Sequence, residues 1–88
     1  DSTRVQAAVA AMLATLEPKP DFYPTFSLRR PHAGECFRRQ GKSFHEPLKK
    51  LCQRLAIASW QRDLLWVIEH DGQARALWLP QRLIWLAA

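Results

Sequence analysis

The sequence contains little glycine and cysteine, and it lacks the motifs that mark common catalytic sites. Only three glycines and two cysteines occur among its 88 residues. It has no G-x-x-x-x-G-K-[ST] or G-x-G-x-x-G phosphate loop and no G-x-S-x-G elbow. It also has no run of eighteen apolar residues, the length that a membrane-spanning helix needs. We therefore expect no catalysis and no bound cofactor in this chain.

The two cysteines, Cys36 and Cys52, are too few for a disulfide framework. We interpret them as reduced thiols of a cytoplasmic protein. With His32 and His45 they form the pattern H-x3-C-x8-H-x6-C, which lacks the closely spaced ligand pair typical of zinc sites, so no metal site is expected. The opening DSTRVQAAVA has no Met and no secretory pattern, and we expect a longer parent protein.

The positive charge is concentrated in the middle of the chain. The formal net charge is +5, yet residues 29–62 hold nine Lys and Arg against two Glu. The rest of the chain holds four basic and six acidic residues. A basic segment on a nearly neutral frame indicates a polyanionic partner. The alternative is a solvated basic face without a specific partner.

The N-terminal part is predicted to be separate from the rest. Residues 1–17 have apolar side chains at helical spacing, and we interpret them as a helix, the tail of a preceding domain. Residues 18–24 hold three of the six prolines, which is typical of a stiff linker and predicts a domain boundary. Residues 25–88 are predicted to form the functional domain.

That domain begins with a predicted strand and continues into a short helix. Phe26 and Leu28 alternate with polar residues, as in a half-buried strand. A helix is predicted to start at Pro47, because proline suits the first helical position. Its buried stripe is predicted to comprise Leu48, Leu51, Cys52 and Leu55. Its outward face is predicted to carry Lys49, Lys50, Gln53 and Arg54, since burying the leucines turns the basic residues to solvent together.

The C-terminal third is predicted to be a β meander. Asp71-Gly72 stands between two apolar runs, the pattern of a two-residue hairpin turn. Residues 82–86 form a further strand, separated from the preceding one by Pro80. The predicted fold class is therefore α+β, with an N-terminal helix, a small sheet with one basic amphipathic helix, and a C-terminal β meander.

Residues 26–79 contain an ordered series of short motifs. The order is a strand ending in basic residues, a G-E turn, a glycine loop, L-K-K with a following glutamine, and an apolar residue before W-x-R-D. These motifs fall on Arg29, Arg30, Gly34, Glu35, Gly41, Leu48, Lys49, Lys50, Gln53, Ile57, Trp60, Arg62 and Asp63. In this order, residues 26–79 resemble the C-terminal domain of tRNA(Ile)-lysidine synthetase. Ala56, Ala58 and Ser59 depart from the family's glycine before the isoleucine and proline before the tryptophan. The ending PQRLIWLAA also differs from the usual closing strand, which leaves a divergent or standalone relative open.

The resemblance implies a function in RNA recognition. The parent enzyme of this family uses ATP and Mg to join lysine to an anticodon cytidine of isoleucine tRNA, in an N-terminal domain whose S-G-G-x-D-S loop does not occur here. The C-terminal domain is implied to contact the tRNA body, chiefly the acceptor stem. The resemblance and the basic face of the helix, with the loop before it, together predict the RNA-binding residues Arg29, Arg30, Arg38, Arg39, Lys42, Lys49, Lys50, Arg54 and Arg62.

Trp60 is predicted to be a structural anchor, whose buried ring covers the end of the helix above Leu48, Leu51 and Leu55. Two other functions remain as alternatives. One is a protein–protein docking module with no nucleic-acid role, which would use the tryptophan-rich C-terminal strands. The other is a DNA-binding helix domain, although the helix-turn-helix pair is missing. Binding through phosphates weakens steeply with salt, whereas an apolar interface hardly responds.

Overall fold

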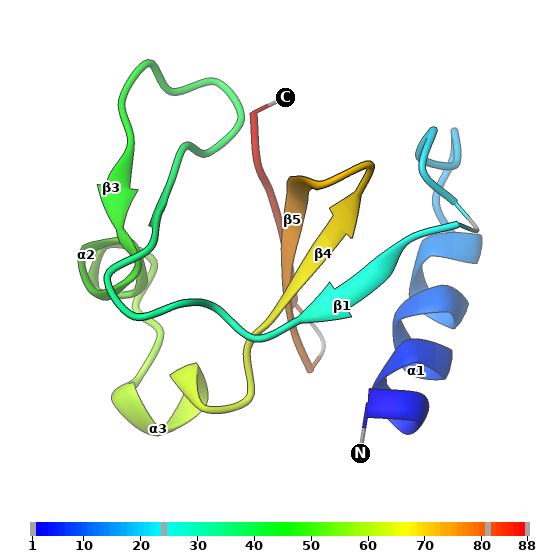
Figure 1. Ribbon diagram of the computed structural model, residues 1–88, viewed down its shortest axis with the longest axis horizontal. Helices are drawn as coiled ribbons and strands as arrows, with labels where there is room; N and C mark the ends of the chain where they lie inside the picture. The colour runs from blue at the N-terminus through cyan, green and yellow to red at the C-terminus, as the bar shows by residue number, and fades with distance from the viewer. Residues whose placement is uncertain (1, 24, 81, 88) are drawn as a thin grey trace.

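The computed structural model describes residues 2–23, 25–80 and 82–87. Its centre is an antiparallel sheet with the strand order β1-β4-β5-β6. The strands are β1 (Ser27–Arg29), β4 (Trp66–His70), β5 (Gln73–Leu79) and β6 (Arg82–Trp85). Helix α1 (Ser2–Ala14) lies on one side of this sheet (Figure 1). The predicted α+β fold class is confirmed, and β4, β5 and β6 form the predicted meander.

The hairpin between β4 and β5 turns at Asp71 and Gly72, as predicted. Their φ angles are 54° and 75°, in the left-handed region that Asp-Gly adopts in a type I′ turn. The pairing places Trp66 opposite Trp78, and the register shifts between Ile68 and Glu69. Such an irregularity adds local twist to a strand pair.

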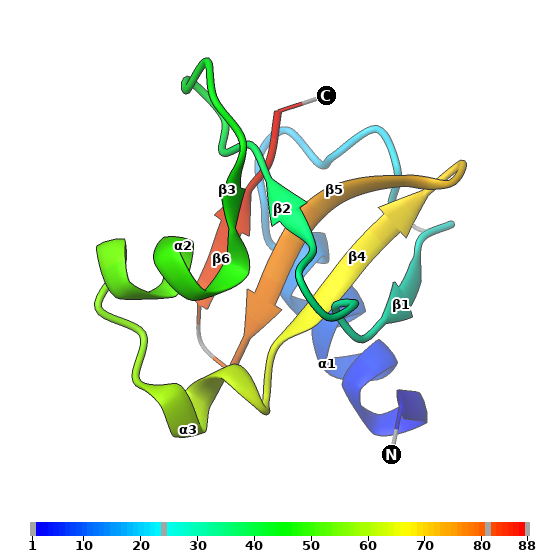
Figure 2. The same cartoon turned by 60° about the vertical axis from the view of Figure 1, so that its left-hand side comes forward.

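A second layer covers the other face of the sheet. It consists of the hairpin β2 (Cys36–Phe37) and β3 (Glu46–Pro47), followed by α2 (Leu48–Arg54) and α3 (Ser59–Arg62), as Figure 2 shows. Two backbone hydrogen bonds fasten this layer to the end of β6. The Gln40 N–H donates to Trp85 O at 3.1 Å, and the Ala87 N–H donates to Arg38 O at 2.8 Å.

Both faces of the sheet are buried, one under α1 and the other under the second layer. Successive strand residues point to opposite faces, so neighbouring residues enter different cores. Val67 belongs to the core under the second layer, together with Leu51, Cys52 and Leu77. Ile68 belongs to the core under α1, which also holds Val9, Leu13, Phe22, Trp78 and the partly buried Trp66 and Trp85. Trp66, Trp78 and Trp85 are therefore packing residues of the core under α1.

Helix α2 begins one residue later than predicted. Pro47 has φ −60° and ψ 150°, so it is an extended cap and part of β3, and helical geometry starts at Leu48. Leu51 is fully buried, and Leu48 and Leu55 pack against the same core. The two-residue strand β3 and the single turn α3 were not predicted, because neither is long enough to show a periodicity.

The end of α2 is a Schellman motif. Ala56 has a φ of 59°. The Ile57 N–H donates to Cys52 O at 2.8 Å, and the Ala56 N–H donates to Gln53 O at 3.2 Å, the two bonds that define the motif.

Among the described helices none is both long and apolar enough to cross a membrane.

Candidate functional site

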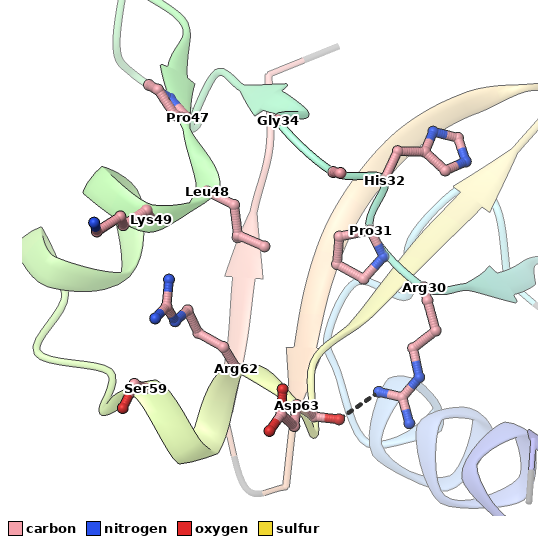
Figure 3. Close-up of a pocket in the computed structure, with 11 residues that line it drawn as sticks. Arg30, Pro31, His32, Gly34, Pro47, Leu48, Lys49, Ser59, Arg62 and Asp63 are labelled. Carbon is pink, nitrogen blue, oxygen red and sulfur yellow. Dashed lines mark hydrogen bonds between the residues drawn. The ribbon is translucent and has the colours of Figure 1, made fainter.

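A groove of about 700 Å³ opens where three segments meet. Its walls come from the connection between β1 and β2 (residues 30–34), the start of α2, and α3 with the residue that follows it (Figure 3). Three basic side chains line it, Arg30, Lys49 and Arg62. Each comes from a different one of these segments, so the tertiary fold, and not a single helix face, gathers the cations.

Arg30 is held at one end of the groove by backbone acceptors. Its Nη1 donates to the carbonyl oxygens of Asp63 at 2.9 Å and Leu65 at 3.0 Å. Its guanidinium carbon also lies 3.9 Å from the centroid of the Trp66 ring, a cation–π distance. Neither contact neutralises the charge, so Arg30 is a positioned cation.

Arg62 and Lys49 carry charges that the fold does not neutralise. Within residues 2–23, 25–80 and 82–87, neither side chain forms a hydrogen bond or an ion pair. Arg62 is half-buried and Lys49 is exposed. Arg62 also lies close enough to the buried Cys52 to act on it: burial raises the pKa of that thiol, and the positive charges of Arg62 and Arg82 oppose the rise.

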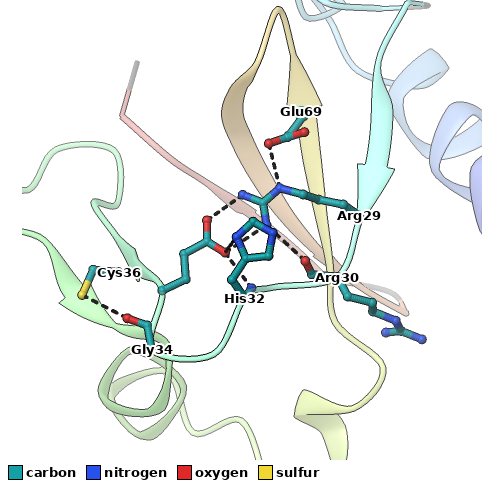
Figure 4. Close-up of polar contacts among 7 residues, drawn as sticks. Arg29, Arg30, His32, Gly34, Cys36 and Glu69 are labelled. Carbon is teal, nitrogen blue, oxygen red and sulfur yellow. Dashed lines mark hydrogen bonds and ion pairs between the residues drawn. The ribbon is translucent and has the colours of Figure 1, made fainter.

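Glu35 fixes the loop that forms one wall of the groove through hydrogen bonds with Arg29 and His32, which Figure 4 labels. Its carboxylate accepts two hydrogen bonds from Arg29, at 2.9 and 2.6 Å, and one from the His32 N–H at 2.9 Å. Its backbone carbonyl accepts from the Leu48 N–H at 3.1 Å, which ties the loop to the start of α2. The hydrogen bonds from Arg29 hold the pKa of Glu35 below its usual value, against the opposing effect of burial.

Arg29 is committed to ion pairs within the fold. Besides Glu35, it contacts Glu69, with 2.7 Å between Arg29 Nε and Glu69 Oε2. The hydrogen bond to Glu35 is the largest cause that raises the pKa of Arg29 above its usual value. Arg29 thereby connects the loop 32–35 to the central strand β4, so we place it in the frame of the groove and not in its lining.

A second paired carboxylate, which is buried, lies just before α2 in the chain. Glu46 is only 5 % exposed and lies between two arginines. Its oxygens are 3.4 Å from Arg39 Nε and 2.9 Å from Arg54 Nε. No sequence pattern indicates this role, because Arg39, Glu46 and Arg54 belong to different elements that only the fold brings together.

The nine basic residues predicted to bind RNA therefore do not form one continuous face. Arg30, Lys49 and Arg62 line the groove, while Arg29 and Arg39 are paired with carboxylates. Lys50 and Arg54 lie beside a shallower hollow on the outer side of α2. Arg38 and Lys42 belong to the β2–β3 loop, where Arg38 Nη1 donates to Lys42 O at 3.2 Å.

The prediction that the Trp60 ring is buried over the helix end is wrong. Trp60 is 67 % exposed, and no residue of α3 is buried. The physical reason is the Schellman motif, in which the residue after the left-handed position turns back onto the helix. Here that residue is Ile57, which is buried in the same core as Cys52. An apolar residue three positions after Arg54, the last residue of the helix, was the signal that could have identified it.

Comparison with known proteins identifies one family. A family model described as "TilS substrate C-terminal domain" matches residues 26–86. The match begins after α1 and includes the sheet, the second layer and the whole groove. No curated protein and no solved structure matches the chain.

Proposed function

The chain belongs to the family of C-terminal domains of tRNA(Ile)-lysidine synthetase, and from this membership we propose that it binds tRNA through the basic groove. The bound part is the tRNA body, chiefly the acceptor stem of isoleucine tRNA. The ATP- and Mg-dependent joining of lysine to the anticodon cytidine belongs to an N-terminal catalytic domain of the parent enzyme. This chain contributes selection of the substrate.

The observation that supports the proposal most directly is the pair of unneutralised cations in the groove. Arg62 and Lys49 line the same hollow as Arg30, all within the matched residues 26–86. Buried and half-buried charges are normally paired inside a protein, so the half-buried, unpaired Arg62 favours an external anion, and the exposed Lys49 can add its charge to the same contact.

The chemistry of the groove suits duplex RNA. An A-form helix hides the base edges of its major groove, so proteins contact its phosphates, its 2′-hydroxyls and its shape. Arginine can bind two phosphate oxygens at once, and lysine adds a point charge. Arg30 is already oriented by Asp63 O and Leu65 O, so little of its side-chain freedom is left to lose on binding. Lys50, Arg54, Arg38 and Lys42 extend the positive surface around the groove.

The experiment is tRNA binding at several salt concentrations by the unaltered chain and by Lys49→Glu/Lys50→Glu. Both lysines are exposed, so the variant should stay folded, as circular dichroism can verify. Each lost phosphate contact should flatten the log–log salt dependence by about 0.7–0.9. Affinity should fall for different RNA duplexes alike, since phosphates carry no sequence.

A matched control is Arg4→Glu/Lys19→Glu, which changes the net charge equally. Arg4 lies on α1, which packs on the opposite face of the sheet from α2 (Figure 1). The control should retain most of the affinity of the unaltered chain. Equal losses in both variants would mean that only the net charge matters. A folded Lys49→Glu/Lys50→Glu variant with unchanged affinity and slope would contradict the proposal.

A second candidate function is docking to another protein, and one observation favours it. Trp60 in α3 and Leu64 just after it are large apolar side chains that are 67 % and 43 % exposed, as apolar residues at docking surfaces are. Such binding would depend on these two side chains and would hardly respond to salt. The salt series described above therefore distinguishes the two candidates.

A further inference from the structure

The groove has properties that contact with a phosphate backbone does not require. Its volume of about 700 Å³ lies within the range of pockets that enclose small organic ligands. Besides its cations it has apolar walls, made by Pro31 and Ala33 on one side and by Pro47 and Leu48 on the other. Figure 3 shows Pro31 and Leu48 pointing toward the same space from opposite sides. Phosphate oxygens gain nothing from such walls, whereas a flat aromatic base does.

The groove also contains a carboxylate that would repel a phosphate. Asp63 lines it, and in the described part of the chain no cation pairs with the Asp63 side chain. A carboxylate accepts hydrogen bonds from the amino groups of bases and from ribose hydroxyls. The Ser59 hydroxyl lines the same groove and can donate or accept. These groups can read the edge of a base, which in a duplex would be occupied by its pairing partner.

The cations line the same groove, so they can hold the charged group of a ligand whose base contacts the apolar walls. Arg62 is the last residue of α3, and Lys49 lies in the first turn of α2. In Figure 3 the Arg62 side chain extends from α3 toward α2. Apolar walls, two unneutralised cations and an acceptor for amino groups together match one nucleotide with its base accessible.

We propose that the groove binds a single unpaired nucleotide of the RNA. Its base lies between Pro31 and Leu48, its phosphate contacts Arg62 and Lys49, and Asp63 accepts a hydrogen bond from the base or the ribose. This inference rests on the proposed RNA binding and adds to it that the domain prefers RNA with an unpaired nucleotide over a fully paired stem. The unpaired nucleotide can come from a strand end or from a bulge.

The experiment compares RNA hairpins that share one stem, bound by the unaltered chain at a fixed salt concentration. One stem is blunt, one has a single-nucleotide overhang, and one has a single-nucleotide bulge; the last two are also prepared with an abasic nucleotide. An unpaired base should raise the affinity about fivefold or more, the lower end of what one base contact contributes. The abasic forms should lose this gain. The overhang and the bulge show which source the groove accepts.

Two variants test whether the preference for an unpaired base comes from the groove. Arg62→Gln should bind the blunt and overhanging stems with nearly equal affinity, because Arg62 lines the groove. Lys50→Gln lies outside the groove and should weaken all the RNAs by a similar factor while keeping the preference. Equal binding of blunt, overhanging and bulged stems by the unaltered chain would overturn the inference and leave the proposed tRNA binding intact. No binding to any RNA would overturn both.

Discussion

At the scale of single residues, Ala56 carries a measurable strain. Its φ of 59° is left-handed, a region that costs a residue with a Cβ roughly 1–2 kcal/mol and glycine very little. Glycine in turn loses more backbone freedom on folding. We expect Ala56→Gly to stabilise the chain by about 1 kcal/mol, measured by urea unfolding. This is also the position where the resembling family carries glycine.

The matched control for Ala56 is Ala58→Gly. Ala58 has φ −66° and ψ 153°, an ordinary extended conformation. Glycine there relieves no strain and should lower the free energy of unfolding by about 0.5–1 kcal/mol, its entropic cost. If both substitutions destabilised the chain equally, the left-handed conformation of Ala56 would not be a source of strain.

Trp60 and Trp78 should differ sharply in what they contribute to stability. Trp78 is 7 % exposed in the core under α1, so Trp78→Ala should cost about 3–5 kcal/mol. Trp60 is mostly exposed, and Trp60→Ala should cost less than about 1 kcal/mol. Thermal unfolding of the two variants checks this. A loss for Trp60→Ala as large as that for Trp78→Ala would mean that its ring is packed in solution.

At the scale of elements, the loop 32–35 depends on an ionised Glu35, and this gives stability a pH dependence. The Arg29 hydrogen bonds hold the pKa of Glu35 below its ordinary value of about 4.5. Its contribution is therefore complete above that value and is lost as the pH falls through the lowered pKa of the folded state. Between pH 5 and pH 3 the unaltered chain should lose more unfolding free energy than Glu35→Gln does.

The control for that pH series is Glu17→Gln, which removes a mostly exposed carboxylate outside the loop. It should retain the pH dependence of the unaltered chain. If the free energy of unfolding fell with pH in the same way for the unaltered chain and for Glu35→Gln, the hydrogen bonds from Arg29 would not stabilise the ionised form of Glu35.

The elements that the sequence predicted well are those whose signal is local. The Asp71-Gly72 hairpin and the leucines of α2 are recognised from neighbouring residues alone. The strand β3 consists of Glu46 and Pro47, two residues that show no alternation and include a proline. Its existence depends on pairing with β2 across a long loop, which no local pattern reveals.

The site was harder to predict, because the partners of charged residues are distant in sequence. Arg29 looked equivalent to Arg30 in the sequence, yet the antiparallel pairing of β1 with β4 places Glu69 beside it. Likewise Glu46 pairs with Arg39 and Arg54 and offsets part of the positive charge that the sequence places in this region. Charge counting therefore found the basic region, while the fold decided which cations stay unneutralised.

At the scale of the whole molecule, the sheet separates two surfaces with different properties. The groove and the basic residues around it lie with the second layer, and α1 covers the opposite face. Helix α1 lies outside the matched residues 26–86, yet Val9 and Leu13 are completely buried against the sheet. Phe22, in the segment predicted to be a linker, is almost fully buried in the same core. The boundary at residues 18–24 stays a prediction.

Helix α1 and the second layer should nevertheless unfold together, because α1 covers strands that also support the groove. All four tryptophans lie within residues 60–85, and three of them pack in the core under α1, so tryptophan fluorescence reports on the matched region and on its contact with α1. We expect Leu13→Ala to lower the free energy of unfolding by about 2–5 kcal/mol in a urea titration followed by this signal. Arg4→Ala, an exposed change on the same helix, should alter it by less than about 0.5 kcal/mol. If Leu13→Ala instead removed helical circular dichroism while the tryptophan transition stayed in place, α1 would be a separate unit, and the sheet would not need it.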